Sequence, residues 1–454
     1  MTDTDVAPAA PAVPADPPKA PSRIRRRAWI VTALLVVFMM INFADKSVLG
    51  LAAEEIRQDL GLSASAFGLA SSAFFLLFSL SGAAVGLLAD RVRPKWLLLI
   101  MAVLWSVSQA PLAVGGGLAV LIASRVLLGA AEGPAYPVAQ QTTLSWFPNH
   151  RRNLPGALIV LGITLGVLVA APVLTWLINH HGWRSAVAAV ALAGVVWTLL
   201  WIPFGGEGPY ATMSDNDPPA EAASDDGPRT GNGTGAGTTG EAQPKMPYRR
   251  ILATRTWIGV TVGYFSTYWV IAFALVWLPS YLRDGLGYSS AVSTQLLMLF
   301  WGLSGILVLG QAGLTGWMMR RGITSRRARG WVGGALLLTS GVSCLSLLVA
   351  PAGAVTVVLL IGAFGLAGAM GSIAATTIME LAPANRRGGA LGTMNAVVTT
   401  AGLIAPTLIG SLVDTHGAEG YRYAVLITGA LLLVGGTAAV TLINPDRDAR
   451  LLSV

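Results

Sequence analysis

A long apolar stretch runs from Trp29 to Ala53 and has the sequence WIVTALLVVFMMINFADKSVLGLAA. An apolar run of this length is typical of a helix that crosses the roughly 30 Å of hydrocarbon in a bilayer. This stretch nevertheless contains two charged residues, Asp45 and Lys46. A charge at the bilayer centre costs about 2.5–3.5 kcal/mol. Charges that persist in such a segment usually face a polar cavity, where they pair and handle a substrate or a proton.

A second apolar stretch, Leu118–Thr143, also carries two charges, Arg125 and Glu132. These residues are seven positions apart, so they share one helix face about 10 Å apart along the axis. Two interpretations remain open. The charges could form a structural ion network that locks the helix bearing Arg125 to the first span. Alternatively, Arg125 meets an anionic substrate or a coupling carboxylate, while Glu132 takes up and releases a proton. The four charges together favour a transporter.

The rest of the chain has the composition of a membrane protein. It has 454 residues, of which 54% are hydrophobic and only 11% charged, against about 25% charged residues in a soluble domain. We therefore predict an all-α integral membrane protein with twelve transmembrane helices. The expected spans lie near residues 29–53, 66–88, 96–115, 118–140, 155–179, 185–204, 257–282, 292–319, 331–350, 354–379, 389–413 and 421–443.

The basic residues follow the pattern of a membrane protein rather than that of a nucleic-acid-binding protein. The net charge is +8, but most Lys and Arg residues outside the spans fall in the two tails and in the loops on the same side. The Arg residues on the other side are Arg57, Arg184, Arg283 and Arg422. Because loops rich in Lys and Arg stay in the cytoplasm, we expect a multi-pass protein with both termini cytoplasmic and no nucleic-acid partner.

A polar segment divides the chain into two halves. Residues 206–250 are rich in Gly, Pro, Ser and Thr, as expected of a flexible cytoplasmic linker. We expect six-helix halves over residues 29–205 and 251–445. A disordered cytoplasmic tail is expected over residues 1–28, and a short cytoplasmic tail over 446–454.

The two halves share a short repeat. The sequence PNHRR at 148–152 precedes the fifth span, and PANRR at 383–387 precedes the eleventh. Both motifs are followed by a proline about 20 residues later, Pro172 and Pro406. The repeat predicts two halves with the same orientation, an architecture of secondary transporters in which the substrate binds between the repeats near mid-membrane.

The loop between the second and third spans resembles a known family signature. Residues 86–95, GLLADRVRPK, are similar to the motif G-x-x-x-D-R-x-G-R-K of the major facilitator superfamily. Arg93 stands where that motif has glycine. The resemblance implies two pseudo-symmetric six-helix halves and alternating access. It also implies a conformational latch formed by Gly86, Asp90 and Arg91. We expect a monomer surrounded by lipid, although the sequence leaves the oligomeric state open.

Two further motifs resemble one branch, the anion:cation symporter family. They are INFADKSVL at 41–49 and RVLLGAAEGP at 125–134, the latter similar to R-x-x-x-G-x-x-E-G-P. The resemblance implies that Asp45 and Glu132 couple protons and that Lys46 and Arg125 contact the anion. Lys46 stands where the family usually has arginine. Because lysine lacks the planar fork of arginine, substrate choice could differ.

Two polar residues in the second half are further candidates for substrate binding. Asn395 lies in the eleventh span and offers donors and acceptors suited to a hydroxylated substrate. A hydrogen bond between helices is an equally good explanation for it. Tyr268, one turn from Tyr264 in the seventh span, could line the cavity or serve packing.

The sequence therefore predicts a proton-coupled importer of a small organic anion in the bacterial cytoplasmic membrane. The anion would be a sugar acid or an aromatic or dicarboxylic acid. The alternatives are a proton-coupled drug or metabolite exporter of the same fold and a non-transporting membrane sensor. No P-loop, metal triad or Ser/His/Asp grouping is visible, so we expect no enzyme activity, no cofactor and no metal.

Overall fold

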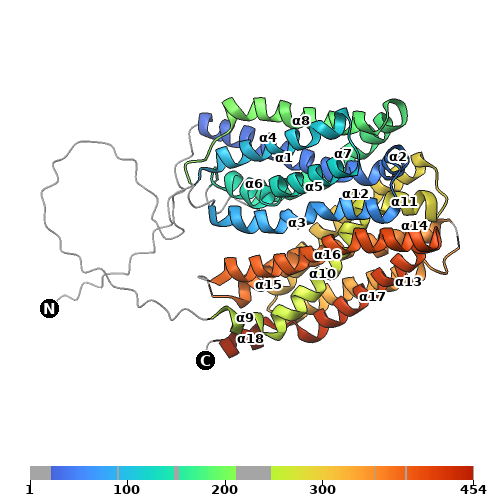
Figure 1. The fold of residues 1–454 in the computed structure, drawn as a ribbon. Helices are drawn as coiled ribbons and strands as arrows, with labels where there is room; N and C mark the ends of the chain where they lie inside the picture. The colour runs from blue at the N-terminus through green and yellow to red at the C-terminus, as the bar shows by residue number, and fades with distance from the viewer. Residues whose placement is uncertain are drawn as a thin grey trace, which may run out of the picture.

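The chain is described by a computed structural model over residues 22–88, 92–147, 153–210, 247–351, 353–383 and 386–452. All secondary-structure elements in these ranges are helical (Figure 1). The first half contains α1 (Ser22–Leu51), α2 (Ala53–Leu60), α3 (Ala64–Leu88), α4 (Pro94–Val114), α5 (Leu118–Glu132), α6 (Ala135–Leu144), α7 (Asn153–His181) and α8 (Trp183–Phe204).

The second half begins at Tyr248 and ends at Leu452. It contains α9 (Tyr248–Leu252), α10 (Arg255–Val276), α11 (Leu278–Ser280), the π-helical turn η2 (Tyr281–Gly285), α12 (Ser290–Arg320), the π-helical turn η3 (Arg326–Trp331), α13 (Val332–Ser346), α14 (Ala354–Leu360), the π-helical turn η4 (Ile361–Gly365), the 3₁₀ turn η5 (Ala367–Ala369), α15 (Met370–Leu381), α16 (Arg387–His416), α17 (Glu419–Leu442) and α18 (Pro445–Leu452).

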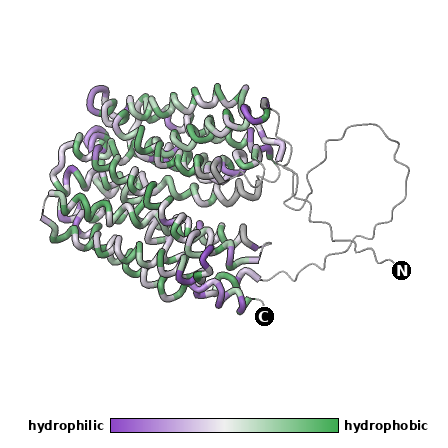
Figure 2. The backbone as a smooth tube through the Cα atoms, turned by 180° about the vertical axis from the view of Figure 1, so that it is seen from behind, coloured by the Kyte–Doolittle hydropathy of each residue, from purple (hydrophilic) through white to green (hydrophobic). Residues whose placement is uncertain are grey.

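Each of the twelve predicted spans corresponds to a helical segment. Within the described ranges, eleven segments are long and apolar enough to cross a membrane. The expected ninth span corresponds to α13, which directly follows η3 and has only 15 residues. Many large hydrophobic side chains lie exposed on the outside of the bundle, and hydrophilic residues gather toward its ends (Figure 2). This distribution is the one that a lipid surround favours.

Three boundaries differ from those expected from hydropathy. Helix α1 begins at Ser22, inside the expected tail, and α18 occupies most of the expected C-terminal tail. Hydropathy identifies only the part of a helix that lies in lipid. Arginine is a good helix former, so a helix with arginines near its end extends beyond that part. The fourth span is interrupted between Glu132 and Ala135, where Pro134 supplies no amide proton.

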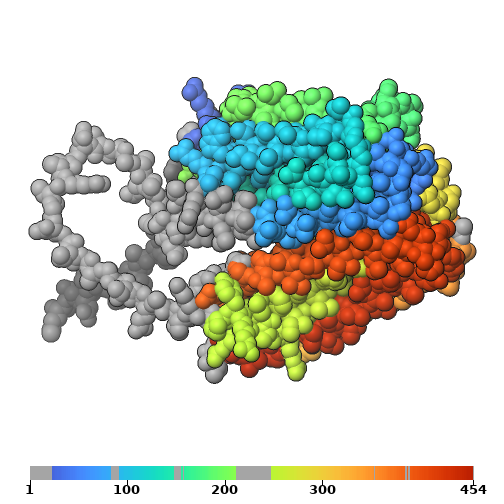
Figure 3. All heavy atoms as spheres, viewed as in Figure 1, coloured from blue at the N-terminus to red at the C-terminus, as the bar shows by residue number. Residues whose placement is uncertain are grey.

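The two halves lie side by side and meet more closely at one end than at the other. Helices α1–α8 form one half and α9–α18 the other (Figure 1). We call the end with Ser22 and Pro445 the terminal end, and the end with α2 the α2 end. The halves are pressed together toward the α2 end and separated by a notch toward the terminal end (Figure 3).

Polar contacts close the α2 end. The carboxylate of Asp414, near the end of α16, accepts hydrogen bonds from the backbone amides of Ala64 and Ser65, both at 2.6 Å. These amides belong to the first turn of α3, where a negative charge is favoured by the helix dipole. Nearby, Arg283 donates to Glu55 at 3.2 Å. Both contacts join the first half to the second.

The contact between α3 and α16 continues from the α2 end to the middle of the bundle. A Cβ on Gly68 would lie 2.3 Å from a backbone carbonyl oxygen of α16, so the two backbones approach as closely as glycine allows. Thr407 then donates to Ser72 at 2.8 Å, and about two turns further Ser79 bonds Thr399. We call this series of contacts the inter-half seam.

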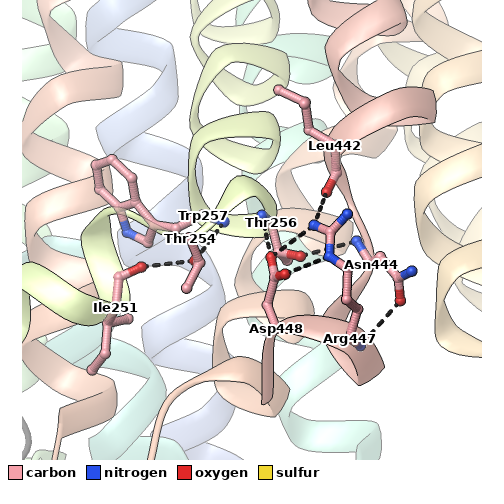
Figure 4. A network of polar contacts seen from close by, with 8 residues as sticks. All are labelled: Ile251, Thr254, Thr256, Trp257, Leu442, Asn444, Arg447 and Asp448. Carbon is pink, nitrogen blue, oxygen red and sulfur yellow. Dashed lines mark hydrogen bonds and ion pairs between the residues drawn. The ribbon is translucent and has the colours of Figure 1, made fainter. Parts of the chain in front are cut away.

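A polar network fixes α18 against the second half at the terminal end (Figure 4). Asp448 accepts hydrogen bonds from the backbone amide of Thr256 at 2.7 Å and from Arg447 Nε at 2.6 Å. The amide of Asn444 donates to the Thr256 hydroxyl at 2.9 Å. Burial raises the pKa of Asp448, but the hydrogen bonds from Arg447 and Thr256 outweigh it and hold the pKa below its ordinary value.

The network predicts a pH-dependent loss of stability for Asp448→Asn. At pH 7 the variant loses the charge-assisted hydrogen bonds and should be less stable by about 1 kcal/mol. Because the folded-state pKa is depressed, this contribution is present above the unfolded-state pKa of about 4 and is lost as pH falls through the folded value. Thermal unfolding followed by tryptophan fluorescence at pH 7 and at pH 3–4 measures both effects.

The matched control is Asp446→Asn on the same helix. Its side chain is half-buried and makes none of these contacts, so the thermal midpoint should stay near that of the unaltered protein. An Asp448→Asn midpoint equal to that of the control at pH 7 would show that the network contributes nothing.

Candidate functional site

Helix α1 directs its two adjacent charges to different partners. Neighbouring side chains on a helix diverge by about 100°, so Asp45 and Lys46 cannot reach the same point. Lys46 contacts Glu132, and Asp45 faces Arg125. Both partners lie on α5, as the spacing of seven residues on one face requires. We call these residues, Asp45, Lys46, Arg125 and Glu132, the four-charge centre.

Lys46 forms a direct ion pair with Glu132. Its Nζ bonds one carboxylate oxygen of Glu132 and also lies 2.5 Å from the side-chain oxygen of Asn42, one turn earlier on α1. The side chain of Lys46 is 9% exposed and that of Glu132 is 0% exposed. Because the pair is shielded from solvent, its attraction is stronger than that of a pair in water.

Asp45 lies in a looser arrangement. One of its oxygens is 4.0 Å from Arg125 Nη2, and the other accepts a hydrogen bond from Gln109 Nε2 at 3.0 Å. Asp45, Arg125 and Gln109 are all fully buried. The Arg125–Asp45 distance is at the limit of an ion pair and leaves room for rearrangement.

Sequence reasoning missed Asn42 and Gln109 as members of the site. Both are amides within membrane-spanning helices, α1 and α4. A polar side chain in a membrane span is uncommon and usually faces the bundle interior. That signal was available, but it could not indicate which charge each amide contacts.

Glycines on α5 bring the site close to α3. A Cβ on Gly129 would lie 1.9 Å from the carbonyl oxygen of Phe74, and one on Gly133 would lie 2.1 Å from that of Phe78. Only glycine permits this approach of the two backbones. Glu132, between these glycines, is thereby held next to α3.

Several buried polar atoms of the site have no hydrogen-bond partner among the described residues. They are Nδ2 of Asn42, Oδ1 of Asp45, Oε1 of Gln109, Nε and Nη2 of Arg125, and Oε1 of Glu132. An unsatisfied buried polar group costs about 1–3 kcal/mol, and more when it is charged. The site therefore has the capacity to accept an anion, a proton or water.

The two candidates of the second half lie apart from the four-charge centre. The ring of Tyr268 is 6.0 Å from that of Phe75 on α3. Asn395 is exposed, one turn from Thr399 toward the terminal end. Within the described ranges, no hydrogen bond or ion pair joins Asn395 or Tyr268 to the four charges.

The predicted latch lies largely beyond what the structure describes. Gly86 belongs to the last turns of α3. Asp90 and Arg91 fall outside the described residues, as do 148–152 of the first repeat motif.

Comparison with known proteins identifies relatives over almost the whole chain. The family profile of the Major Facilitator Superfamily matches residues 34–377. A hexuronate transporter of Bacillus subtilis is 27% identical over 421 residues, which cover 91% of this chain and 94% of the relative. A gallate transporter of Pseudomonas putida is 30% identical over 304 residues, 64% of this chain and 66% of the relative.

The fold also matches solved structures. A bacterial homologue of the human lysosomal transporter Spinster superposes with a TM-score of 0.71 at 16% sequence identity. The superposition covers 94% of this chain and 98% of that one. The predicted fold of twelve helices in two halves is therefore confirmed.

The geometry of the site predicts strong coupling between Lys46 and Glu132. Lys46→Met alone leaves a buried carboxylate without its partner and should destabilise the protein by about 3–5 kcal/mol. Combining it with Glu132→Leu removes both charges and should recover most of that loss. Thermal unfolding of the two single variants and the double variant measures the coupling.

The exposed pair Arg184–Asp59 provides the matched control. Its side chains are 33% and 44% exposed, so Arg184→Met should cost only about 0–1 kcal/mol. If Lys46→Met costs no more than Arg184→Met, the buried pair does not hold α1 to α5.

Proposed function

The chain belongs to the Major Facilitator Superfamily, and from this premise we propose that it carries a small organic anion together with protons. The superfamily consists of membrane transporters, so the chain is not an enzyme. The observation that carries the proposal is the pairing of two buried cations with two buried carboxylates. Buried cations favour an anionic cargo, and carboxylates that exchange partners provide for proton coupling.

The coupling follows from charge balance. A substrate carboxylate that pairs with Lys46 takes the place of Glu132. An unpaired carboxylate costs several kcal/mol in a buried site, so Glu132 then binds a proton. Arg125 and Asp45 would respond in the same way to a second negative charge on the substrate, because their separation of 4.0 Å leaves room for an anion to draw Arg125 away. Anion and proton therefore bind together and leave together.

The relatives support an acid as the substrate. The Bacillus subtilis protein carries a hexuronate and the Pseudomonas putida protein carries gallate, and both are carboxylates. They fit the resemblance to the anion:cation symporter family and favour an organic anion over a drug as the cargo. Asn395 and Tyr268, which lie near the terminal end of the inter-half seam, are proposed as further substrate contacts.

We assign the terminal end to the cytoplasm of a bacterial cell. Arginine residues of α1, α9, η3 and α18 lie at this end, in agreement with the preference of basic segments for the cytoplasmic side. We further propose a monomer whose two halves are joined on this side, between Phe204 and Tyr248. In this orientation the notch in Figure 3 opens to the cytoplasm.

Transport would require the halves to rock about the site. The inter-half seam closes the outer side in the structure, and Asp414 must release the first turn of α3 before that side can open. The loop with Gly86, Asp90 and Arg91 is proposed to latch the opposite state.

Proton-driven uptake by purified protein in liposomes tests the proposal. With glucuronate, galactonate and 4-hydroxybenzoate as the panel, at least one anion should accumulate when the outside is acidic, and a protonophore should abolish accumulation. Glu132→Gln cannot take up a proton at this position, so it should reduce accumulation to equilibration while exchange of labelled for unlabelled substrate persists.

Glu419→Gln is the control, because Glu419 is 60% exposed at the α2 end. It should accumulate substrate as the unaltered protein does. Accumulation driven by a sodium gradient without a proton gradient, or undiminished accumulation by Glu132→Gln, would contradict the proposal.

A further inference from the structure

Three phenyl rings surround the ammonium group of Lys46. Its Nζ lies 4.7 Å from the ring centroid of Phe43, 5.5 Å from that of Phe74 and 5.7 Å from that of Phe78. A cation within about 6 Å of a ring face is attracted by the negative charge of that face. The rings therefore stabilise the ammonium group and also form its nearest apolar surroundings.

The polar surroundings of Lys46 are sparse. Among the described residues, its Nζ donates only to oxygens of Asn42 and Glu132. When a substrate takes the place of Glu132, the atoms of the substrate next to its carboxylate must lie against the rings. The aromatic character of those rings then determines which chemical group next to the carboxylate is favoured.

A series of neighbouring aromatic rings extends from the first half to the second half. The centroids of Phe78 and Phe75 are 6.2 Å apart, those of Phe75 and Tyr268 are 6.0 Å apart, and those of Tyr268 and Tyr264 are 6.3 Å apart. We call this set the aromatic wall; it comprises Phe43, Phe74, Phe75, Phe78, Tyr264 and Tyr268. Phe78 and both tyrosines are only half-buried, so the wall is accessible at the point where the halves separate.

Two serine hydroxyls beside the aromatic wall are already bonded within the protein. Ser79 bonds Thr399 across the inter-half seam. The Ser81 hydroxyl donates to the carbonyl oxygens of Phe78 and Gly129, at 3.2 Å and 3.4 Å. These two serine hydroxyls are therefore already bonded and are not free to pair with substrate hydroxyls that lie against the rings.

On the basis of the anion transport proposed above, we propose that the substrate is a benzenoid carboxylate. Its carboxylate pairs with Lys46 and its ring packs against Phe43, Phe74 and Phe78. Ring pairs gain edge-to-face and offset contacts beyond area burial. A polyhydroxylated acid would bury hydroxyls against the same rings without partners, which a site of this kind disfavours.

Binding by the purified full-length protein tests the proposal with two anions of equal charge. Titration calorimetry at pH 7 with 4-hydroxybenzoate and with D-glucuronate gives the ratio of their affinities. We expect 4-hydroxybenzoate to bind at least tenfold more tightly. Phe78→Leu keeps an apolar side chain but removes the ring, and it should reduce the preference about tenfold by weakening 4-hydroxybenzoate binding alone.

Phe265→Leu is the matched control, because Phe265 lies on α10 and packs against Trp269 rather than near Lys46. It should leave the ratio unchanged. Phe43→Leu serves as the second test variant if Phe78→Leu does not give a monodisperse protein with a cooperative thermal transition.

The outcomes separate this inference from the proposed function. Tighter binding of glucuronate, or equal weakening of both anions by Phe78→Leu, would overturn the benzenoid assignment. If glucuronate were then accumulated with protons, the proposed function would stand without it. If neither anion bound and no anion of the panel were transported, both would fail.

Discussion

The requirement for charge neutrality in a buried site determines how this protein is built. Four charges are buried among the helices, so each must have an opposite charge close by. Lys46 has Glu132, and Asp45 has Arg125 and the amide of Gln109. Side chains of α1 must therefore reach those of α5, and Gly129 and Gly133 bring α3 against the same part of α5. An anion that enters this balanced set must bring a compensating positive charge, and a proton is the smallest that can be supplied.

The position of the site relative to the two halves allows substrate binding to be coupled to their movement. The inter-half seam runs from Asp414 to Thr399 and ends beside Phe78. Beyond that point the halves separate, and the half-buried rings of the aromatic wall face the region between them. The four-charge centre belongs to the first half alone, whereas Tyr268 and Asn395 belong to the second. The affinity for a substrate that contacts both groups would depend on the relative position of the halves. Coupling of binding to movement requires such a dependence.

The sequence predicted more of the fold than of the contacts. Composition and hydropathy were sufficient to identify the spans, and a charge in an apolar segment was sufficient to identify Asp45, Lys46, Arg125 and Glu132. Which cation pairs with which carboxylate could not be predicted, because the divergence of adjacent side chains permits either arrangement. The α18 network and the inter-half seam were also unpredictable. They join residues that are far apart in the chain and depend on how whole helices pack.

Proton uptake on anion binding tests the central claim most directly. The purified protein in weakly buffered solution at neutral pH is mixed with a saturating amount of an anion that it binds, and a pH indicator reports protons taken from solution. If charge neutrality governs the site, about one proton is taken up for each monovalent anion bound, because an unpaired carboxylate is too costly to bury. Binding of the anion with no proton uptake would contradict the account.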